Sequence, residues 1–146
     1  MAGILFDTSV YITVLRQADT SVLGLRRALR IGGRQTWPLW LSIVVLEELY
    51  AGAVDAKVRR DLQRMEREFD IIGRLLLPNR RDWTSAGQVL CKIGQKYGFN
   101  RIGRARLTND ALIAMSVASH GFTIQTKNPR DFQLIAEFRP FDFQAV

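Results

Sequence analysis

Strand-like apolar runs and helix-like patterns alternate along the chain, and this alternation constrains the fold more than any other feature. The runs lie near residues 3–7, 35–41, 71–77, 122–125 and 138–143. The segments between them carry apolar residues at helical spacing. Strands that alternate with helices are typical of α/β domains built on a central, mostly parallel sheet. We therefore expect an α/β fold of this kind.

The length and charge of the chain limit the number of domains and the kinds of partner that we expect. Its 146 residues are enough for one domain with a real core, and no repeat or linker divides residues 1–146. Lys and Arg number 21 against 14 Asp and Glu, which gives a net charge of +7. The electrostatic field of a protein with this positive charge attracts polyanions, of which nucleic acid is the usual one. The alternative is a basic protein without such a partner.

The scarcity of Cys and His excludes several kinds of chemistry. Cys91 is the single cysteine, so no disulfide can form within the chain, which fits a reducing cytoplasm. His120 is the single histidine, which excludes a His pair or a His-rich zinc site within one chain. No apolar run approaches the roughly 20 residues that span a bilayer, and no basic leader precedes Gly3. We expect a cytoplasmic protein without membrane contact.

Three acidic residues stand where polar groups are unusual. Asp7 follows an apolar strand, Glu48 lies among core-like helix positions, and Asp110 opens the most hydrophobic helix. If the strands at 3–7 and 122–125 are central and parallel, all three acids reach the edge where ligands of α/β sheets bind. Taken singly, each has a simpler explanation. Asp7 and Asp110 could be N-caps, and Glu48 could face solvent.

A divalent cation would explain why acids gather. Carboxylates placed together repel one another and resist ionisation, and a cation removes this cost. Ligand sets made only of oxygen suit Mg²⁺ or Mn²⁺, which can orient a phosphodiester and activate a bound water. Glu47 points about 100° away from Glu48 on a helix, so the two cannot share one role. We prefer Glu48 for the site.

Four segments together resemble the PIN-domain family, and within it the VapC-type ribonuclease toxins of bacterial toxin–antitoxin pairs. Residues 4–9 look like the opening strand with its metal-binding aspartate, and residues 41–53 look like the Ser-to-Glu-Leu helix. Residues 109–114 look like the Asp-x-Leu-Ile-Ala helix, and residues 126–132 like the Thr-x-Asn-x-x-Asp-Phe segment. The segments follow the family's order and extend over nearly the whole chain.

The resemblance implies a PIN-like three-layer fold and an endoribonuclease that depends on Mg²⁺ or Mn²⁺. It also implies a homodimer inhibited by a cognate antitoxin protein. By register, Asp7, Glu48 and Asp110 would bind metal directly or through water. Asn128 stands where many PIN enzymes carry an acid, so we expect Asp131 to be the fourth acid and Asn128 to contact substrate or water. A helix cap or an ion pair with a nearby arginine is the alternative for Asp131.

Hydroxyls and basic residues would complete such a site. We expect three hydroxyls to hydrogen-bond the carboxylates, with plain capping or turn formation as the alternative: Thr8, Ser9 and Thr126. We expect basic residues to hold RNA phosphates, with a solvated basic loop as the alternative: Arg101, Arg104, Arg106, Lys127 and Arg130.

A second function from another class remains open at this point. A catalytically inert PIN-like module could bind RNA or protein without cutting it. Such a module would be expected to lack one of Asp7, Glu48 and Asp110, whereas all three are present here. The acid set therefore favours the enzyme.

Overall fold

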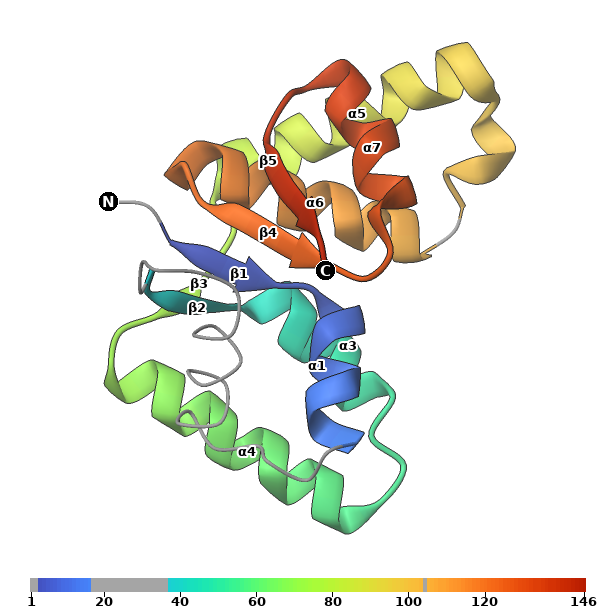
Figure 1. Cartoon of the computed structure of the whole chain (residues 1–146). Coiled ribbons are helices and arrows are strands. Elements are labelled where there is room, and N and C mark those ends of the chain that lie inside the picture. Colours follow the sequence, from blue (N-terminus) through green and yellow to red (C-terminus); the bar gives the residue numbers. More distant parts are fainter. Residues whose placement is uncertain (1–2, 17–36, 104) are drawn as a thin grey trace.

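The sheet is all-parallel and has its first strand at its centre (Figure 1). The computed structural model describes residues 3–16, 37–103 and 105–146. Within these ranges the five strands have the order β3-β2-β1-β4-β5. They are β1 (Ile4–Phe6), β2 (Leu39–Ser42), β3 (Leu75–Leu76), β4 (Thr123–Thr126) and β5 (Asp142–Ala145). The expected α/β fold is confirmed, and the first and fourth strands are neighbours in parallel, which is the condition under which the three acids reach one edge of the sheet.

Helices flank this sheet in two groups. Figure 1 shows α1, α3 and α4 on the half that carries β2 and β3, and α5, α6 and α7 around β4 and β5. Their bounds are α1 (Thr8–Arg16), α3 (Ile43–Ala51), α4 (Ala56–Ile71), α5 (Arg80–Tyr97), the 3₁₀ turn η1 (Phe99–Arg101), α6 (Ala105–His120) and α7 (Pro129–Phe138). The helix expected between residues 21 and 33 lies outside the described residues. Within the described ranges, each helix is too short or too polar to span a membrane.

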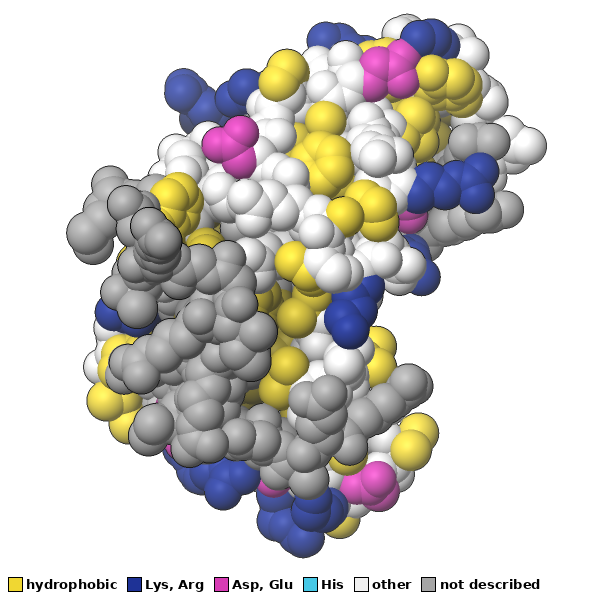
Figure 2. Space-filling model, in the orientation of Figure 1, with side chains coloured by type: hydrophobic (Ala, Val, Ile, Leu, Met, Phe, Trp, Pro, Cys, Tyr) yellow, Lys and Arg dark blue, Asp and Glu magenta, His cyan; other side chains and the backbone are white. Residues whose placement is uncertain are grey.

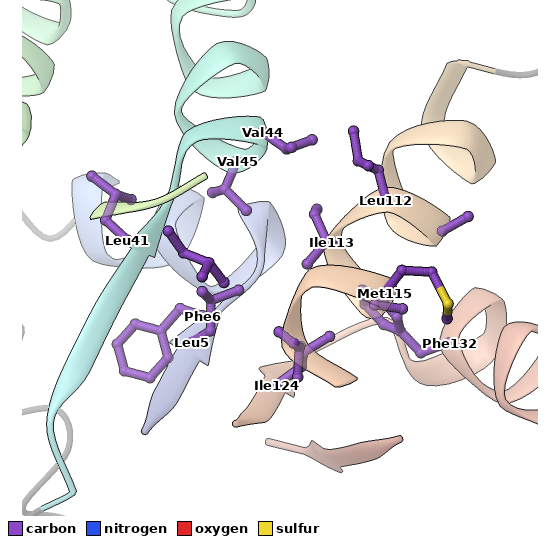
Figure 3. Packing of buried hydrophobic residues seen from close by; sticks show 14 of the residues in the cluster. Leu5, Phe6, Leu41, Val44, Val45, Leu112, Ile113, Met115, Ile124 and Phe132 are labelled. Carbon is purple, nitrogen blue, oxygen red and sulfur yellow. The ribbon is translucent and has the colours of Figure 1, made fainter. Parts of the chain in front are cut away.

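The core brings α3 and α6 together over the carboxyl end of β1. Figure 3 shows Val44 and Val45 of α3 and Leu112 and Ile113 of α6 turned toward the space between the two helices. All four side chains are buried. Burial of such side chains contributes roughly 1.5–3 kcal/mol each. This packing holds the acids of both helices at one edge of the sheet.

The third and fifth strands differ from the sequence prediction. Ile71 belongs to α4 and not to a strand, since the helix continues past the buried Phe69 and ends at Ile71, whose side chain is 84% exposed. A turn at Gly73, whose φ is +69°, then leaves only Leu75–Leu76 for β3. Likewise α7 continues to Phe138, and β5 begins only at Asp142.

The sequence predicts that one helix begins at Asp82 or Thr84 and another at Thr108, and both helices begin earlier. Helix α5 begins at Arg80, because Asn79 and Asp82 form a capping box. Helix α6 begins at Ala105 and not at residue 108, so Asp110 lies inside the helix.

Pro38 lies in the second apolar run and predicts an edge position or a bend there, but β2 is not an edge strand. Strand β2 pairs with β1 on one side and β3 on the other, and it begins one residue after the proline. The Pro38 carbonyl accepts a hydrogen bond of 2.9 Å from the Ile4 backbone N–H. The proline therefore precedes the strand, where its missing N–H removes no ladder bond.

The capping box of α5 gives a test of the fold. Asn79→Ala should lower the free energy of unfolding by about 1 kcal/mol, because the Asp82 N–H loses its side-chain acceptor at 2.8 Å. Urea unfolding followed by circular dichroism measures the change. Gln88→Ala, at an exposed position of the same helix, is the control and should change the value by less than about 0.5 kcal/mol. Equal values for the two variants would contradict the capping role.

Candidate functional site

Asp7 connects three elements at the end of β1. It is buried, and its backbone N–H donates to the Gln125 carbonyl of β4 at 3.1 Å. Its Oδ1 accepts from the Val10 N–H at 3.3 Å and from the Ser9 hydroxyl at 2.5 Å. Asp7 therefore caps α1, as the simpler explanation required. Capping occupies only one of its two carboxylate oxygens.

The second oxygen of Asp7 binds the turn between β4 and α7. The buried Thr126 hydroxyl donates to Asp7 Oδ2 at 2.5 Å. The same hydroxyl accepts from the Asn128 N–H, and the Ser9 hydroxyl accepts from the Lys127 N–H, each at 2.9 Å. These bonds fix the carboxylate and the turn relative to each other.

Glu48 does not simply face solvent. It is half-buried on α3, and its Oε1 accepts a hydrogen bond of 3.0 Å from the Thr8 hydroxyl of α1. Burial raises the pKa of Glu48, and the charge of Glu47 raises it further, while the Thr8 hydroxyl lowers it. The expected hydrogen bonds of Thr8, Ser9 and Thr126 to carboxylates are thus all present.

Asp110 carries the strongest sign of an acidic site. It is 8% exposed and lies in the second turn of α6, so it is not the N-cap of that helix. Burial, together with the smaller effects of the charges of Glu48, Asp131 and Asp7, raises its pKa to about 8. Arg106 opposes this shift. The other three predicted acids therefore all lie within electrostatic reach of Asp110.

Two hollows surround these acids. A cavity of about 200 Å³ is lined by Asp7, Arg106, Asp110, Asn128, Arg130 and Asp131. A wider groove of about 690 Å³ runs along α1 and α3 and includes Glu48. Figure 2 shows a hollow between the two halves of the molecule, with Lys and Arg side chains on its upper rim.

Arg106 and Asn128 line both hollows. With its amide oxygen turned toward Arg106, Asn128 accepts a hydrogen bond of 2.8 Å from the guanidinium. Asn128 precedes α7, but its side chain makes no capping hydrogen bond. Its side chain therefore positions the Arg106 guanidinium between the two hollows.

The donor set fits a hydrated divalent cation. All four acids offer oxygen, and the repulsion that raises the pKa of Asp110 would be relieved by a cation. Among the described residues, no three His, Cys, Asp or Glu side chains are arranged to hold one ion directly. Mg²⁺ keeps several waters and often binds proteins through only one or two carboxylates. The arrangement therefore suits binding that is partly through water.

The predicted basic residues divide into two groups. Arg106, Lys127 and Arg130 are exposed and line one or both hollows. Arg104 and the side chain of Arg101 lie outside the described part of the chain.

Sequence reasoning missed a role for two residues. Glu47 and Asn109 line the wider groove, and the Asn109 amide donates to Glu47 at 3.4 Å. On the helix Glu47 points away from Glu48, and its contact with Asn109 across the groove is a tertiary effect. The signal in the sequence was the Asn that precedes Asp110.

Three solved structures are similar to this chain over almost its whole length. A chain of DNA-bound VapBC from Salmonella typhimurium is 20% identical, covering 99% of this chain and 98% of that one, with a TM-score of 0.67. A chain of VapBC-1 from nontypeable Haemophilus influenzae is 19% identical, covering 97% of this chain and 96% of that one, with a TM-score of 0.64. A chain of VapBC2 from Rickettsia felis, bound to a promoter DNA fragment, is 16% identical, covering 98% of each chain, with a TM-score of 0.63.

These likenesses concern the fold. No family model matches the sequence, and no curated protein matches it either. At identities of 20% or less, the similarity shows that the chain has the fold of these VapBC chains. The fold that the sequence resemblance implied is confirmed.

The raised pKa of Asp110 predicts how the stability of the metal-free protein depends on pH. The folded protein holds this proton up to a pKa of about 8, whereas an unperturbed Asp ionises near 3.8. The folded state therefore binds more protons between these values, and the free energy of unfolding should fall as the pH rises toward 8. Urea unfolding in EDTA at pH 5 and pH 8 measures this fall.

Asp110→Asn is the matched variant for this measurement. It removes the titrating group, so its free energy of unfolding relative to wild type should be higher at pH 8 than at pH 5. An identical pH dependence in both proteins would contradict the assignment.

Proposed function

We propose that this protein is a metal-dependent endoribonuclease and the toxin of a toxin–antitoxin pair, with a VapC-type PIN domain. The observation that carries the proposal is Asp110, a buried carboxyl whose pKa is raised to about 8 beside three other acids. Proteins rarely bury a carboxyl among like charges unless the arrangement serves chemistry. The site also lies where the central parallel strands end, which is where α/β folds bind ligands.

The residues that would hold Mg²⁺ or Mn²⁺, directly or through water, are Asp7, Glu48, Asp110 and Asp131. The bound cation would activate water and stabilise the charge that develops on the phosphodiester. The chain's own contribution is to orient the carboxylates. Thr126 and Ser9 each hold one oxygen of Asp7, and Thr8 holds Glu48.

The substrate that suits this site is a polyanion. Arg106, Lys127 and Arg130 surround the acids, and the whole chain carries a net charge of +7. Lys and Arg bind phosphates without regard to sequence, so these residues would position the RNA backbone. Arg101 and Arg104 remain predicted phosphate contacts.

A protein partner belongs to the same proposal. The similar solved structures are of VapBC, in which the matching chain is crystallised as part of a named pair. We infer that a cognate antitoxin binds this chain and silences it. We also propose that the protein is a cytoplasmic homodimer.

The inert-module alternative receives no support from the described residues. Such a module needs no buried carboxyl among like charges. Here Asp7 makes hydrogen bonds through both carboxylate oxygens, and Asp110 remains buried beside it. Maintaining this arrangement costs stability, which favours a site that is used.

The direct test is RNA cleavage by the purified, antitoxin-free protein. Wild type should cut RNA in Mg²⁺ or Mn²⁺ and stop in EDTA. Asp7→Asn and Asp110→Asn should each reduce the rate by about 100-fold or more, because the charge stabilisation that a metal supplies amounts to several kcal/mol. Denaturing gels of end-labelled RNA measure the rate.

Asp70→Asn, an exposed acid on α4, is the control and should keep the wild-type rate. Circular dichroism must show that each variant is folded. Cleavage that survives both Asp7→Asn and Asp110→Asn would exclude the metal site. A folded wild type that cuts no RNA in either metal would favour the inert module.

The Thr126 hydroxyl gives a further prediction. Thr126→Val removes the donor to Asp7 Oδ2 with little change in volume, and should weaken Mn²⁺ binding by about 10- to 100-fold. Thr126→Ser keeps the donor and should bind nearly as wild type does. Isothermal titration calorimetry measures both affinities. If Val and Ser variants bind Mn²⁺ equally, the hydroxyl does not orient Asp7.

A further inference from the structure

The wider groove has two walls of different chemical character. Its cationic side chains, Arg106 and Lys127, come from α6 and from the turn after β4. The wall formed by α1 and α3, which the turn after β4 adjoins through the hydrogen bond from the Lys127 N–H to Ser9, contributes no Lys or Arg among the described lining residues. It presents Ile12, Thr13 and Ala51 together with two carboxylates. A nucleic acid in this groove would therefore place its phosphates on the Arg106 wall and its bases on the α1–α3 wall.

Glu47 lies on the wall that would face the bases. Its side chain is exposed, and a carboxylate repels phosphate. The group that it can bind favourably is a donor of hydrogen bonds. Asn109 donates to its Oε2 at 3.4 Å, and hydrogen bonding from Asn109 also lowers the pKa of the neighbouring Glu48. One amide thus links Glu47 to the acid of the site.

Ile12 supplies the second element of a base site. It is 40% exposed although it is a large aliphatic residue, and it lines the same groove as Glu47. Proteins recognise single-stranded RNA by packing the face of a base and hydrogen-bonding its edge. Ile12 offers the face contact, and Glu47 offers two acceptor oxygens to the edge.

The hydrogen-bonding groups on the edge of each base then identify the base that this site would bind. A carboxylate accepts two hydrogen bonds side by side, so it matches an edge with two adjacent N–H donors. Guanine has this edge in its N1–H and N2–H groups, whereas adenine and cytosine place an acceptor beside the amino group and uracil offers a single N–H. We propose that this groove is a base-recognition subsite in which Glu47 selects guanine next to the phosphodiester that is cut. This inference rests on the proposed ribonuclease function.

The experiment compares cleavage of matched oligonucleotides. Two single-stranded RNAs differ only by guanosine or inosine at one position, so that only the 2-amino group is lost. Wild type should cut next to guanosine about tenfold faster than next to inosine, because inosine lacks one of the two donors that the carboxylate binds. Glu47→Gln and Glu47→Ala should lose this ratio. Asp70→Asn, an exposed acid outside the groove, should retain it.

A binding measurement separates this inference from the proposed function. Fluorescence anisotropy of the same oligonucleotides with Asp110→Asn reports guanine preference without requiring cleavage. If wild type cuts nothing but Asp110→Asn still binds the guanosine RNA more tightly, and adding Glu47→Gln removes that preference, the subsite stands and the nuclease proposal fails.

Two results would overturn the subsite. One is a guanosine-to-inosine ratio that is equal in wild type and Glu47→Gln, in cleavage and in binding. The other is loss of a second bound Mn²⁺ in Glu47→Gln with base preference unchanged, measured by titration of Mn²⁺ alone. That result would assign Glu47 to a cation.

Discussion

The site depends on the hydrogen bonds that hold Asp7 at the end of β1. Its backbone N–H binds β4, one carboxylate oxygen binds the start of α1, and the other binds Thr126. A single residue thus ties the central strand, the first helix and the β4–α7 turn together. These contacts fix the Asp7 carboxylate near Asp110, whose pKa is raised mainly by its own burial and then by the charges of Glu48, Asp131 and Asp7.

The parts that could be predicted from sequence are those set by local pattern. Three apolar residues followed by Asp7 predict a buried strand that ends in an acid, and β1 and β4 do pair at the centre of the sheet. Ser42 caps α3 as its position before an apolar helix suggests. The alternation of strands and helices was enough to predict a parallel sheet, because parallel strands require crossover connections, which are usually helices.

The parts that could not be predicted depend on contacts between distant segments. The early start of α6 was hidden because polar residues precede Leu107, whose burial is a tertiary effect. Which hydroxyl binds which acid also follows from packing: Thr8 reaches Glu48, and Ser9 reaches Asp7. Glu47 acquires a partner only because α6 lies across the groove from α3. Helix geometry alone separates Glu47 from Glu48 but cannot say what Glu47 faces.

The central claim is that these acids together hold a divalent cation. Electron paramagnetic resonance of Mn²⁺ added to the metal-free protein tests it most directly, because bound Mn²⁺ loses the sharp signal of the free aqueous ion. The account predicts saturable binding to wild type that is lost in Asp7→Asn and in Asp110→Asn, while Asp70→Asn binds as wild type does. The claim would be contradicted if folded wild type left the signal of free Mn²⁺ unchanged. It would also be contradicted if all four proteins bound Mn²⁺ equally.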